Sequence, residues 1–413
     1  MSLTVRRGAF RPLPWLFLFA CRNEPSPVSP TVRERWDARA VVTAPRLSLA
    51  AVSAGDYHTC GLTTGGAVYC WGAKPTAVPG GFTFGALTAG GNHDCGLIAS
   101  GAAYCWGDNS WGQLGNGTTA GSAVPIAVEG GLSFASLSAG GLHTCGRTRA
   151  GALYCWGAND VGQLGIGTNT GPEICNYNPC STKPVAVAGG LTFLAHGAGF
   201  AFTCGLTTSG AAHCWGDNTF GELGDGTTAD SSVPVAVAGG LTFVSIGAGD
   251  FQSCGLTTAG ATHCWGDNRY GQLGIGTSYG PESCRTFESC STVPVAVVGG
   301  LAFAGVAVGG DHTCGLVGRA AYCWGYNLYG ELGIGTNVGP EVCFVRTPFD
   351  YCSTVPVAVT GGLAFTVLSA GYAHTCGLTA RKAAYCWGDN SSQQLGINEP
   401  VLLFSMPALV AAP

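Results

Sequence analysis

Apolar and small residues alternate in short segments along most of this chain, and turn residues separate the segments. In the unit Leu241–Val297, the segment LTFVSIGAG alternates and ends at Ala248-Gly249. The segments SCGLTT and ATHCWG flank Ala259-Gly260, an arrangement typical of a β-hairpin. A glycine-rich loop, DNRYGQLGIGT, then leads to the segment VPVAV. The pattern predicts four short strands in this unit.

The unit recurs seven times, as the stretch Cys254–Gly274 (CGLTTAGATHCWGDNRYGQLG) shows most fully. Every copy holds two cysteines, and the second is always followed by Trp-Gly. The first cysteines are Cys60, Cys95, Cys145, Cys204, Cys254, Cys314 and Cys376, and the second are Cys70, Cys105, Cys155, Cys214, Cys264, Cys323 and Cys386. Repetition at this spacing indicates a propeller or a solenoid. Four strands in each of seven units predict an all-β, seven-bladed β-propeller.

The two ends of the repeat region predict how the ring closes. Residues from Arg46 onward match the first strand of a unit, whereas Met406–Val410 match the last strand, VPVAV. We therefore expect Met406–Val410 to pair within a blade that N-terminal strands complete. Such pairing of N- and C-terminal strands would remove the open sheet edges.

Three segments of the repeat resemble the regulator-of-chromosome-condensation family. They are G-x-N-x-x-G-Q-L-G at Gly157–Gly165, x-A-G-x-x-H-T around His143-Thr144, and V-P-x-x-V at Val124-Pro125. The resemblance covers residues 46–413 and implies a seven-bladed propeller. By analogy with the eukaryotic exchange factor of that family, it also implies guanine-nucleotide exchange on a small GTPase.

Two features depart from that family pattern. One is the cysteine pair in every unit. The other is the first unit, in which Trp71-Gly72 runs directly into AKPTAVPGG without a GQLG loop.

The cysteine content indicates an oxidising compartment. Of 21 cysteines, fourteen form the seven pairs within the units, and six more form the local pairs Cys175/Cys180, Cys284/Cys290 and Cys343/Cys352. Directly opposed residues at a non-hydrogen-bonded site of an antiparallel hairpin have Cα atoms about 4.5 Å apart, a distance that a disulfide accepts. Ten disulfides are therefore expected. Zinc binding and free buried thiols are the alternatives, although zinc sites need cysteines that converge on one ion.

The unpaired cysteine, Cys21, ends an apolar segment that follows a basic start. Residues 1–21 resemble a secretory signal, and LFAC resembles the bacterial lipoprotein cleavage box, in which the cysteine is lipidated. A plain signal peptide with a chance cysteine is the alternative. Residues 22–45 are proline-rich and read as a tether, and residues 46–413 form the ring. We expect an exported monomer at the bacterial outer membrane or cell surface, held only by its lipid, or else secreted.

Candidate binding residues lie in loops that we expect on one rim of the ring. Three units carry insertions, at residues 169–183, 278–293 and 337–355, each with its own cysteine pair. Their aromatic residues are Tyr177, Tyr279, Phe287, Phe344, Phe349 and Tyr351. A second aromatic set, Trp111, Phe220, Tyr270 and Tyr329, precedes the glycine of the GQLG or GELG loops. Loops on a rigid scaffold often bind partners, but loop decoration and packing between blades are the alternative readings.

Three other periodic residue types have structural interpretations. A histidine stands two residues before the first cysteine in five units, and its replacement by Phe202 and Gln252 in the others favours hydrogen bonding over a metal channel. The seven tryptophans after the second cysteines predict packing between blades. An Asp-Asn pair opens the loop in four units, which indicates a side-chain-capped turn rather than a calcium site.

The sequence points to binding rather than catalysis. It contains none of the common zinc-protease, nucleophile-elbow or phosphate-loop motifs, and no cofactor or metal is expected. The net charge of −5 argues against nucleic acid as a partner. We expect a module that binds a protein or an envelope polymer. The alternatives are a polysaccharide-directed enzyme with a site in the central channel and, third, an exchange factor.

Overall fold

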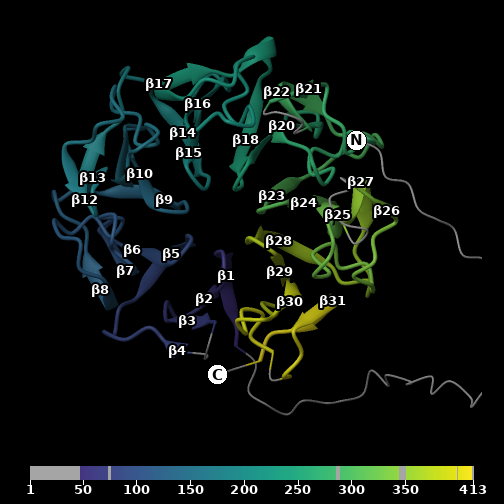
Figure 1. The fold of residues 1–413 in the computed structure, drawn as a ribbon. Helices are drawn as coiled ribbons and strands as arrows, with labels where there is room; N and C mark the ends of the chain where they lie inside the picture. The colour runs from purple at the N-terminus through teal and green to yellow at the C-terminus, as the bar shows by residue number, and fades with distance from the viewer. Residues whose placement is uncertain (1–46, 73–75, 285–288, 344–349, 398, 412–413) are drawn as a thin grey trace, which may run out of the picture. The chain divides into compact units, whose positions relative to one another are not determined.

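Seven antiparallel sheets form a closed ring. The computed structural model describes residues 47–72, 76–284, 289–343, 350–397 and 399–411. The leader with Cys21, the tether, and Phe287, Phe344 and Phe349 lie outside the described residues. In each sheet the first strand is innermost and the following strands lie successively outward as a meander, except that three sheets carry an additional short strand at the outer edge (Figure 1). The predicted all-β, seven-bladed propeller is confirmed.

The first four blades run consecutively along the sequence. Blade 1 contains β1 (Leu49–Ala54), β2 (Thr59–Thr63), β3 (Val68–Trp71) and β4 (Thr76–Ala77). Blade 2 contains β5 (Phe84–Ala89), β6 (His93–Ile98), β7 (Ala103–Gly107) and β8 (Ser122–Ala127). Blade 3 contains β9 (Phe134–Ala139), β10 (His143–Thr148), β11 (Leu153–Ala158), β12 (Glu173–Cys175) and β13 (Asn178–Ala186). Blade 4 contains β14 (Phe193–Ala198), β15 (Phe202–Thr207), β16 (Ala212–Gly216) and β17 (Ser231–Ala236).

The remaining three blades continue the same order after a short 3-10 turn, η1 (Ala238–Gly240). Blade 5 contains β18 (Phe243–Ala248), β19 (Gln252–Thr257), β20 (Thr262–Asp267), β21 (Glu282–Ser283) and β22 (Ser289–Ala296). Blade 6 contains β23 (Gly305–Val308), β24 (His312–Val317), β25 (Ala320–Tyr326), β26 (Glu341–Val342) and β27 (Tyr351–Ala358). Blade 7 contains β28 (Phe365–Ala370), β29 (His374–Thr379), β30 (Ala384–Asp389) and β31 (Leu403–Leu409). The insertions thus add a fifth, outermost strand to blades 3, 5 and 6.

A disulfide cross-links the central hairpin of every blade. Cys254 and Cys264 are directly opposite each other in the ladder of β19 and β20, with Cα atoms 4.1 Å apart. The equivalent pairs in the other blades have Cα separations of 4.0–4.1 Å. The insertions carry the other three disulfides, Cys175–Cys180, Cys284–Cys290 and Cys343–Cys352. The ten expected cysteine pairs are therefore all bonded in the structure.

The expected exchange of strands between the chain ends is wrong. β31 pairs with β30 of its own blade, and β1 pairs with β2. The first unit supplies its own outer strand, the short β4, so blade 1 is complete without C-terminal residues. Both ends of the ring region fall at a boundary between blades, and β31 pairs within its own unit.

The ring closes by packing of blade 7 against blade 1. Leu49 and Trp71 of blade 1 share a buried apolar cluster with Leu395 and Val410 of blade 7. Leu49 N–H also donates to the Lys382 carbonyl at 2.9 Å. The other six junctions have an equivalent bond, such as Phe193 N–H to the Gly151 carbonyl at 2.9 Å. The seam that joins the termini therefore resembles the seams between consecutive blades.

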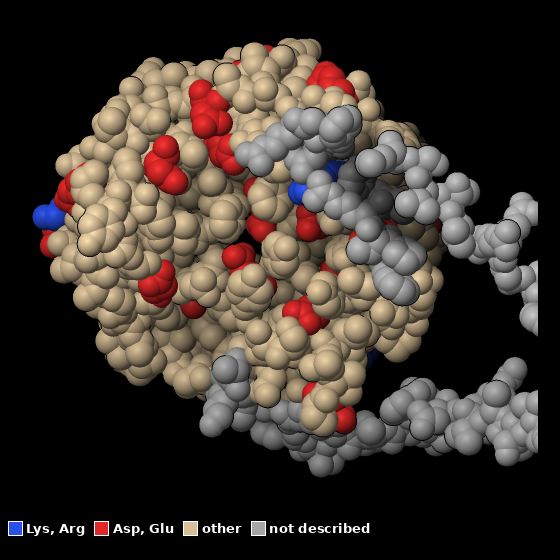
Figure 2. Space-filling model, in the orientation of Figure 1, with Lys and Arg blue, Asp and Glu red and all other residues tan. Residues whose placement is uncertain are grey.

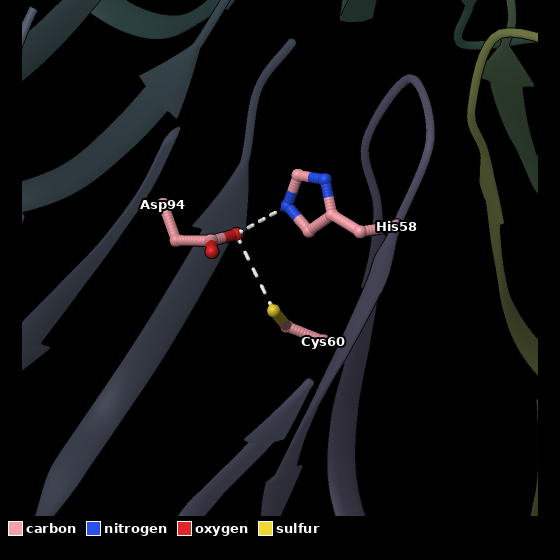
Figure 3. Close-up of side chains that lie close together, drawn as sticks. All are labelled: His58, Cys60 and Asp94. Carbon is pink, nitrogen blue, oxygen red and sulfur yellow. Dashed lines mark hydrogen bonds and ion pairs between the residues drawn. The ribbon is translucent and has the colours of Figure 1, made fainter. Parts of the chain in front are cut away.

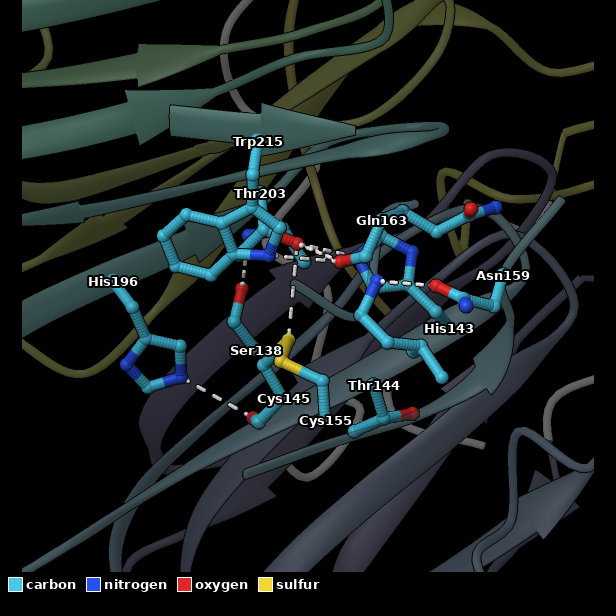
Figure 4. Close-up of a disulfide and its surroundings, with 12 residues drawn as sticks. Ser138, His143, Thr144, Cys145, Cys155, Asn159, Gln163, His196, Thr203 and Trp215 are labelled. Carbon is cyan, nitrogen blue, oxygen red and sulfur yellow. Dashed lines mark hydrogen bonds between the residues drawn. A yellow bond between two sulfur atoms is a disulfide. The ribbon is translucent and has the colours of Figure 1, made fainter. Parts of the chain in front are cut away.

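Each regular seam combines aromatic packing with a buried hydrogen-bond chain, shown for blades 3 and 4 in Figure 4. Thr203 Oγ1 donates to the Gln163 carbonyl at 3.0 Å, so its oxygen accepts from His143 Nε2 at 2.8 Å. Trp215 Nε1 donates to the same Gln163 carbonyl at 3.0 Å. The Trp215 ring packs 5.8 Å from Phe193 between centroids. These bonds satisfy buried polar groups that would otherwise destabilise the interface.

The other periodic positions also take structural roles. His93, His312 and His374 bond a threonine of the next blade at 2.7 Å, as predicted for this histidine position. Gln252 Nε2 instead donates to the Gly309 carbonyl at 3.1 Å. In the predicted Asp-Asn turns, Asp108, Asp217, Asp267 and Asp389 accept a backbone N–H two residues later.

Among the residues that the structure describes, no helix has both the length and the apolar character needed to cross a bilayer.

Candidate functional site

One face of the ring, here called the loop face, collects the variable loops. In a four-stranded meander, the turn from the first to the second strand and the connection from the third to the fourth lie at the same end. The GQLG loops and the insertions all follow a third strand, so they lie on this face as expected. The opposite face carries the hairpin turns and the Gly-Gly connections.

The candidate aromatic residues do not form a single surface. Tyr177 is 98% exposed and Tyr279 is 72% exposed in the insertions of blades 3 and 5. Tyr351 and Trp111 are partly buried. Phe220 is buried, with its ring 5.6 Å from the ring of Phe251 and under the guanidinium of Arg269.

Tyr270 and Tyr329, by contrast, come together in a pocket between blades 5, 6 and 7. We call it the tyrosine pocket, with a volume of about 160 Å³. Its chief lining residues are Tyr270, Asp311, Tyr326, Tyr329, Glu331 and Tyr372. The ring centroids of Tyr270 and Tyr326 lie 4.4 Å apart, and those of Tyr326 and Tyr329 lie 6.4 Å apart. Turns and loop residues of three blades thus build one concave aromatic site.

Two carboxyl groups of this pocket have buried oxygens without a hydrogen-bond partner. Glu331 is 1% exposed, and its Oε2 accepts from Tyr329 N–H at 2.9 Å while Oε1 is unpartnered. Asp311 Oδ1 is likewise buried and unpartnered. Burial raises the pKa of Glu331 to about 8 and that of Asp311 to about 7. Nearby carboxyl groups add to both shifts, whereas the Arg269 charge opposes the shift of Asp311.

The basic groups near the pocket are Arg269, whose charge partly offsets that of Asp311, and His312. Arg269 donates from Nε to Asp267 Oδ2 at 2.9 Å and lies over the ring of Phe220. His312 lines the pocket, but burial lowers its pKa to about 4, so its imidazole is uncharged near neutral pH. The pocket therefore offers carboxyl oxygens and aromatic faces without a cation of its own among the described residues.

Further carboxyl groups lie at the centre of the ring. Asp56 and Asp250 line a central channel whose other walls are mostly glycine and alanine from the ends of the innermost strands. Burial and the neighbouring carboxylates Asp56 and Asp311 raise the pKa of Asp250 well above its ordinary value. Figure 2 shows acidic side chains near the ring centre and few basic ones on the viewed face. The channel mouth is therefore acidic.

The seam between blades 1 and 2 departs from the regular pattern. Blade 1 lacks the GQLG loop, so there is no loop carbonyl for a threonine hydroxyl to donate to. Asp94 stands in that threonine position and accepts from His58 Nε2 at 2.9 Å (Figure 3). Burial by itself would lower the pKa of His58, but the Asp94 carboxylate raises it overall. A bond to a carboxylate thus replaces the histidine–threonine bond in this seam.

Three side-chain groups in the described residues bring candidate metal ligands together. They are His58 with Cys60 and Asp94, Glu173 with Cys175 and Cys180, and Glu341 with Cys343 and Cys352. Every cysteine in them is disulfide-bonded. Because cysteine binds metals as a thiolate, these sulfurs do not serve as ligands while oxidised. The remaining groups are too few for a tetrahedral zinc site.

Comparison with known proteins identifies the repeat. The Regulator of chromosome condensation (RCC1) repeat matches residues 100–146, 150–204, 209–256 and 259–316. A second form of this repeat matches residues 50–73, 134–163, 195–222, 243–272 and 365–394. The chain belongs to the RCC1 repeat family, which confirms the resemblance seen in the sequence.

Individual relatives match only part of the chain or share mainly its fold. The ultraviolet-B receptor UVR8 of Arabidopsis thaliana is 33% identical over 94 residues, which are 22% of this chain and 19% of the receptor. The crystal structure of Prp20p from Saccharomyces cerevisiae has a TM-score of 0.70 and 19% identity, covering 85% of this chain and 87% of that one. The receptor-kinase CR4 ectodomain of Physcomitrella patens has a TM-score of 0.51 and 26% identity, covering 82% and 72%.

Sequence reasoning identified Tyr270 and Tyr329 as candidate binding residues, and both line the tyrosine pocket. It missed Asp311, Tyr326, Glu331 and Tyr372. A signal was present, because Tyr326 occupies the aspartate position of the loop and Glu331 the glutamine position. Both departures fall in one unit and change the side-chain chemistry of a structural turn. Tyr372 gave no such signal, since it reaches the pocket from the neighbouring blade.

Proposed function

We propose that this protein is an exported propeller that binds a protein or an envelope polymer through its loop face. The observation that carries the proposal is the concentration of three cross-linked insertions and the tyrosine pocket on that face. The proposed role is binding rather than catalysis, with the protein acting as a monomer that does not bind nucleic acid. Lipidation of Cys21 would hold the ring at the bacterial outer membrane or cell surface.

Ten disulfides support export, because such bonds persist in oxidising compartments. The CR4 relative is the ectodomain of a receptor kinase, so an extracellular setting has a precedent in this fold at 26% identity. The periodic polar residues of the repeat, such as His143 and Asp217, are used in seams and capped turns. Side chains of the variable loops on the loop face are therefore the candidates for contact with a partner.

The binding role is tested by replacing the insertions one at a time. In blade 6, residues 337–352 are replaced by the Thr228-Ala229-Asp230 connection of blade 4, which keeps β27 from Ser353 onward and removes both cysteines together. Matching replacements are residues 169–180 in blade 3 and 278–290 in blade 5. Binding of the purified ring to isolated cell envelopes should fall for at least one replacement, whereas equal binding by all three would contradict the proposal.

The anchoring is tested by the intact mass of the mature protein. A mass that begins at Cys21 and includes acyl chains is expected. Alkylation without reduction should add no groups, and alkylation after reduction should add two groups per disulfide. A mature chain that begins elsewhere and carries no lipid would overturn the anchor, and thiols that react without reduction would overturn export.

A polysaccharide-directed enzyme is the second candidate, and the carboxyl groups of the channel favour it. Asp250 has a raised pKa and shares the channel with Asp56, and glycoside hydrolysis uses a carboxyl pair of which one is protonated. This candidate predicts that the protein releases reducing ends from an envelope polysaccharide and that Asp250→Asn abolishes the release. Absence of turnover by the native protein would reject it.

A further inference from the structure

The tyrosine pocket contains groups that the fold does not need. At the position of Glu331, four other blades use glutamine, and Gln272 shows why: its Oε1 accepts from Tyr270 N–H at 2.8 Å and its Nε2 donates to Asp267 at 3.0 Å. Blades 4 and 6 have glutamate here, and Glu222 and Glu331 each accept one backbone N–H and leave Oε1 unpartnered. Only in blade 6 is the aspartate also replaced, by Tyr326. Glu331 lines the pocket, and its second oxygen completes no turn.

The chemistry of the pocket selects a cation. Glu331 Oε1 and Asp311 Oδ1 are buried acceptors without donors. A positive charge is also attracted to aromatic faces within about 6 Å, and four tyrosines line the same pocket. A neutral apolar group would leave both carboxyl oxygens unsatisfied.

The size and shape of the pocket restrict the kind of cation that fits. A cavity of about 150 Å³ holds a group the size of benzene, so a pocket of about 160 Å³ takes one side chain rather than a length of polymer. The two free oxygens belong to separate carboxyl groups and do not form a planar pair. They therefore suit a compact ammonium with three donors better than the flat fork of a guanidinium.

We propose that the tyrosine pocket binds the ammonium group of a lysine side chain from a protein partner. Glu331 and Asp311 accept hydrogen bonds from the ammonium, and Tyr270, Tyr326, Tyr329 and Tyr372 surround its alkyl chain. The inference deepens the proposed binding role and rests on it for the partner being a protein. It does not depend on the insertions or on the lipid.

The test uses small probes and variants whose new residues already occur at the equivalent position of another blade. Binding of n-butylammonium chloride, n-butanol and Nα-acetyl-lysine methylamide is measured by titration calorimetry and saturation-transfer NMR. The solution is held at about pH 9, where the Glu331 carboxyl is largely ionised. Glu331→Gln follows Gln272, and Tyr326→Ala follows Ala158. The matched control is Glu222→Gln, the same change at a buried glutamate outside the pocket.

Saturable binding of butylammonium and of the lysine derivative, with no binding of butanol, is the expected result. Glu331→Gln should weaken binding about tenfold or more, and Tyr326→Ala about threefold. Glu222→Gln should leave it unchanged. Equal binding of butylammonium and butanol, or equal effects of the two glutamate variants, would overturn the proposal. Binding of butylammonium without the lysine derivative would overturn the assignment to a protein side chain.

These outcomes are independent of the loop-replacement experiment. Loss of envelope binding in a loop replacement with intact butylammonium binding would leave the pocket assignment standing. The converse, envelope binding that is unaffected by Glu331→Gln in a protein that binds no ammonium, would reject the pocket and leave the loop-face proposal intact.

Discussion

Single positions of the repeat take different chemical roles in different blades. Gln272 completes a turn in blade 5, whereas Glu331 at the same position of blade 6 leaves a buried carboxyl oxygen unpartnered. The pKa of Glu331 is higher in the folded protein than its ordinary value of 4.5. The stability that its protonated carboxyl contributes to the fold is therefore fully present below pH 4.5 and is lost as the pH rises through about 8. The pocket thus costs the fold stability in alkaline solution.

Glu331→Gln should therefore stabilise the protein in a pH-dependent way. The free energy of unfolding should change little near pH 4 and rise by roughly 3–5 kcal/mol near pH 9, because glutamine has no charge to bury. Denaturant titrations at the two pH values measure the difference. Gln272→Glu is the reverse change and should destabilise the protein at neutral pH, since a second carboxyl would face Asp267. A gain that is the same at both pH values would contradict the reasoning.

A tryptophan comparison tests the seam hydrogen bond. Trp215 Nε1 donates to a loop carbonyl at 3.0 Å, whereas the buried Trp71 Nε1 has no partner. Trp215→Phe should lose both packing and the hydrogen bond, and Trp71→Phe only packing. We expect the first to cost about 1 kcal/mol more in the free energy of unfolding. Equal losses in calorimetric or denaturant unfolding would show that the bond contributes little.

Residue-level patterns predicted the fold far better than the pocket. Trp265 and the pair Cys254–Cys264 recur at one place in every unit, so their periodicity alone specifies strands, seams and cross-links. The tyrosine pocket depends on the angle between blades, which brings Tyr372 beside Tyr326 although one does not follow the other in any motif. The spacing of residues along the sequence does not predict the angle between blades.

At the scale of single elements, the cross-linked hairpin is the rigid part of each blade. Its two strands are also sequence neighbours, so the contacts of the hairpin are local in the sequence. The expected exchange of Met406–Val410 into an N-terminal blade was wrong for a related reason, because β31 has its partner nearby in sequence. Matching strand patterns at the two chain ends indicated a complete set of strands and could not tell which blade each one joined.

Removing one hairpin disulfide should weaken the ring without changing its shape. In Cys204→Ala/Cys214→Ala, closure of a loop of about ten residues is lost, which corresponds to about 3 kcal/mol in the chain-entropy model. Circular dichroism should remain that of the native protein while the unfolding midpoint falls. The double change Cys175→Ala/Cys180→Ala is the control, since it alters an insertion and should leave the seams intact. A larger effect of the control would contradict the reasoning.

At the scale of the whole molecule, all seven seams share a backbone hydrogen bond between blades and buried apolar packing. The seam between blade 7 and blade 1, which joins the termini, has both. The chain can therefore be opened at another junction. Joining residue 411 to residue 47 through a short linker, with new ends between Gly189 and Gly190, should give a folded ring with a melting temperature within a few degrees of the native one. New ends between Ser209 and Gly210 divide blade 4 and should lower the melting temperature more. Equal losses for the two permutants would show that the junctions are not interchangeable.

A ring of seven similar blades offers a ligand seven nearly equivalent orientations, and random choice among them corresponds to about 1.1 kcal/mol of orientational entropy. The blades of this ring differ in their outer strands and loops. Blades 3, 5 and 6 carry an extra strand, and blade 1 has no GQLG loop. No rotation by whole blades reproduces that arrangement, so any partner that touches two of these features meets the protein in one rotational setting. The irregular blades thus restrict such a partner to a single orientation on a ring that is otherwise nearly symmetric.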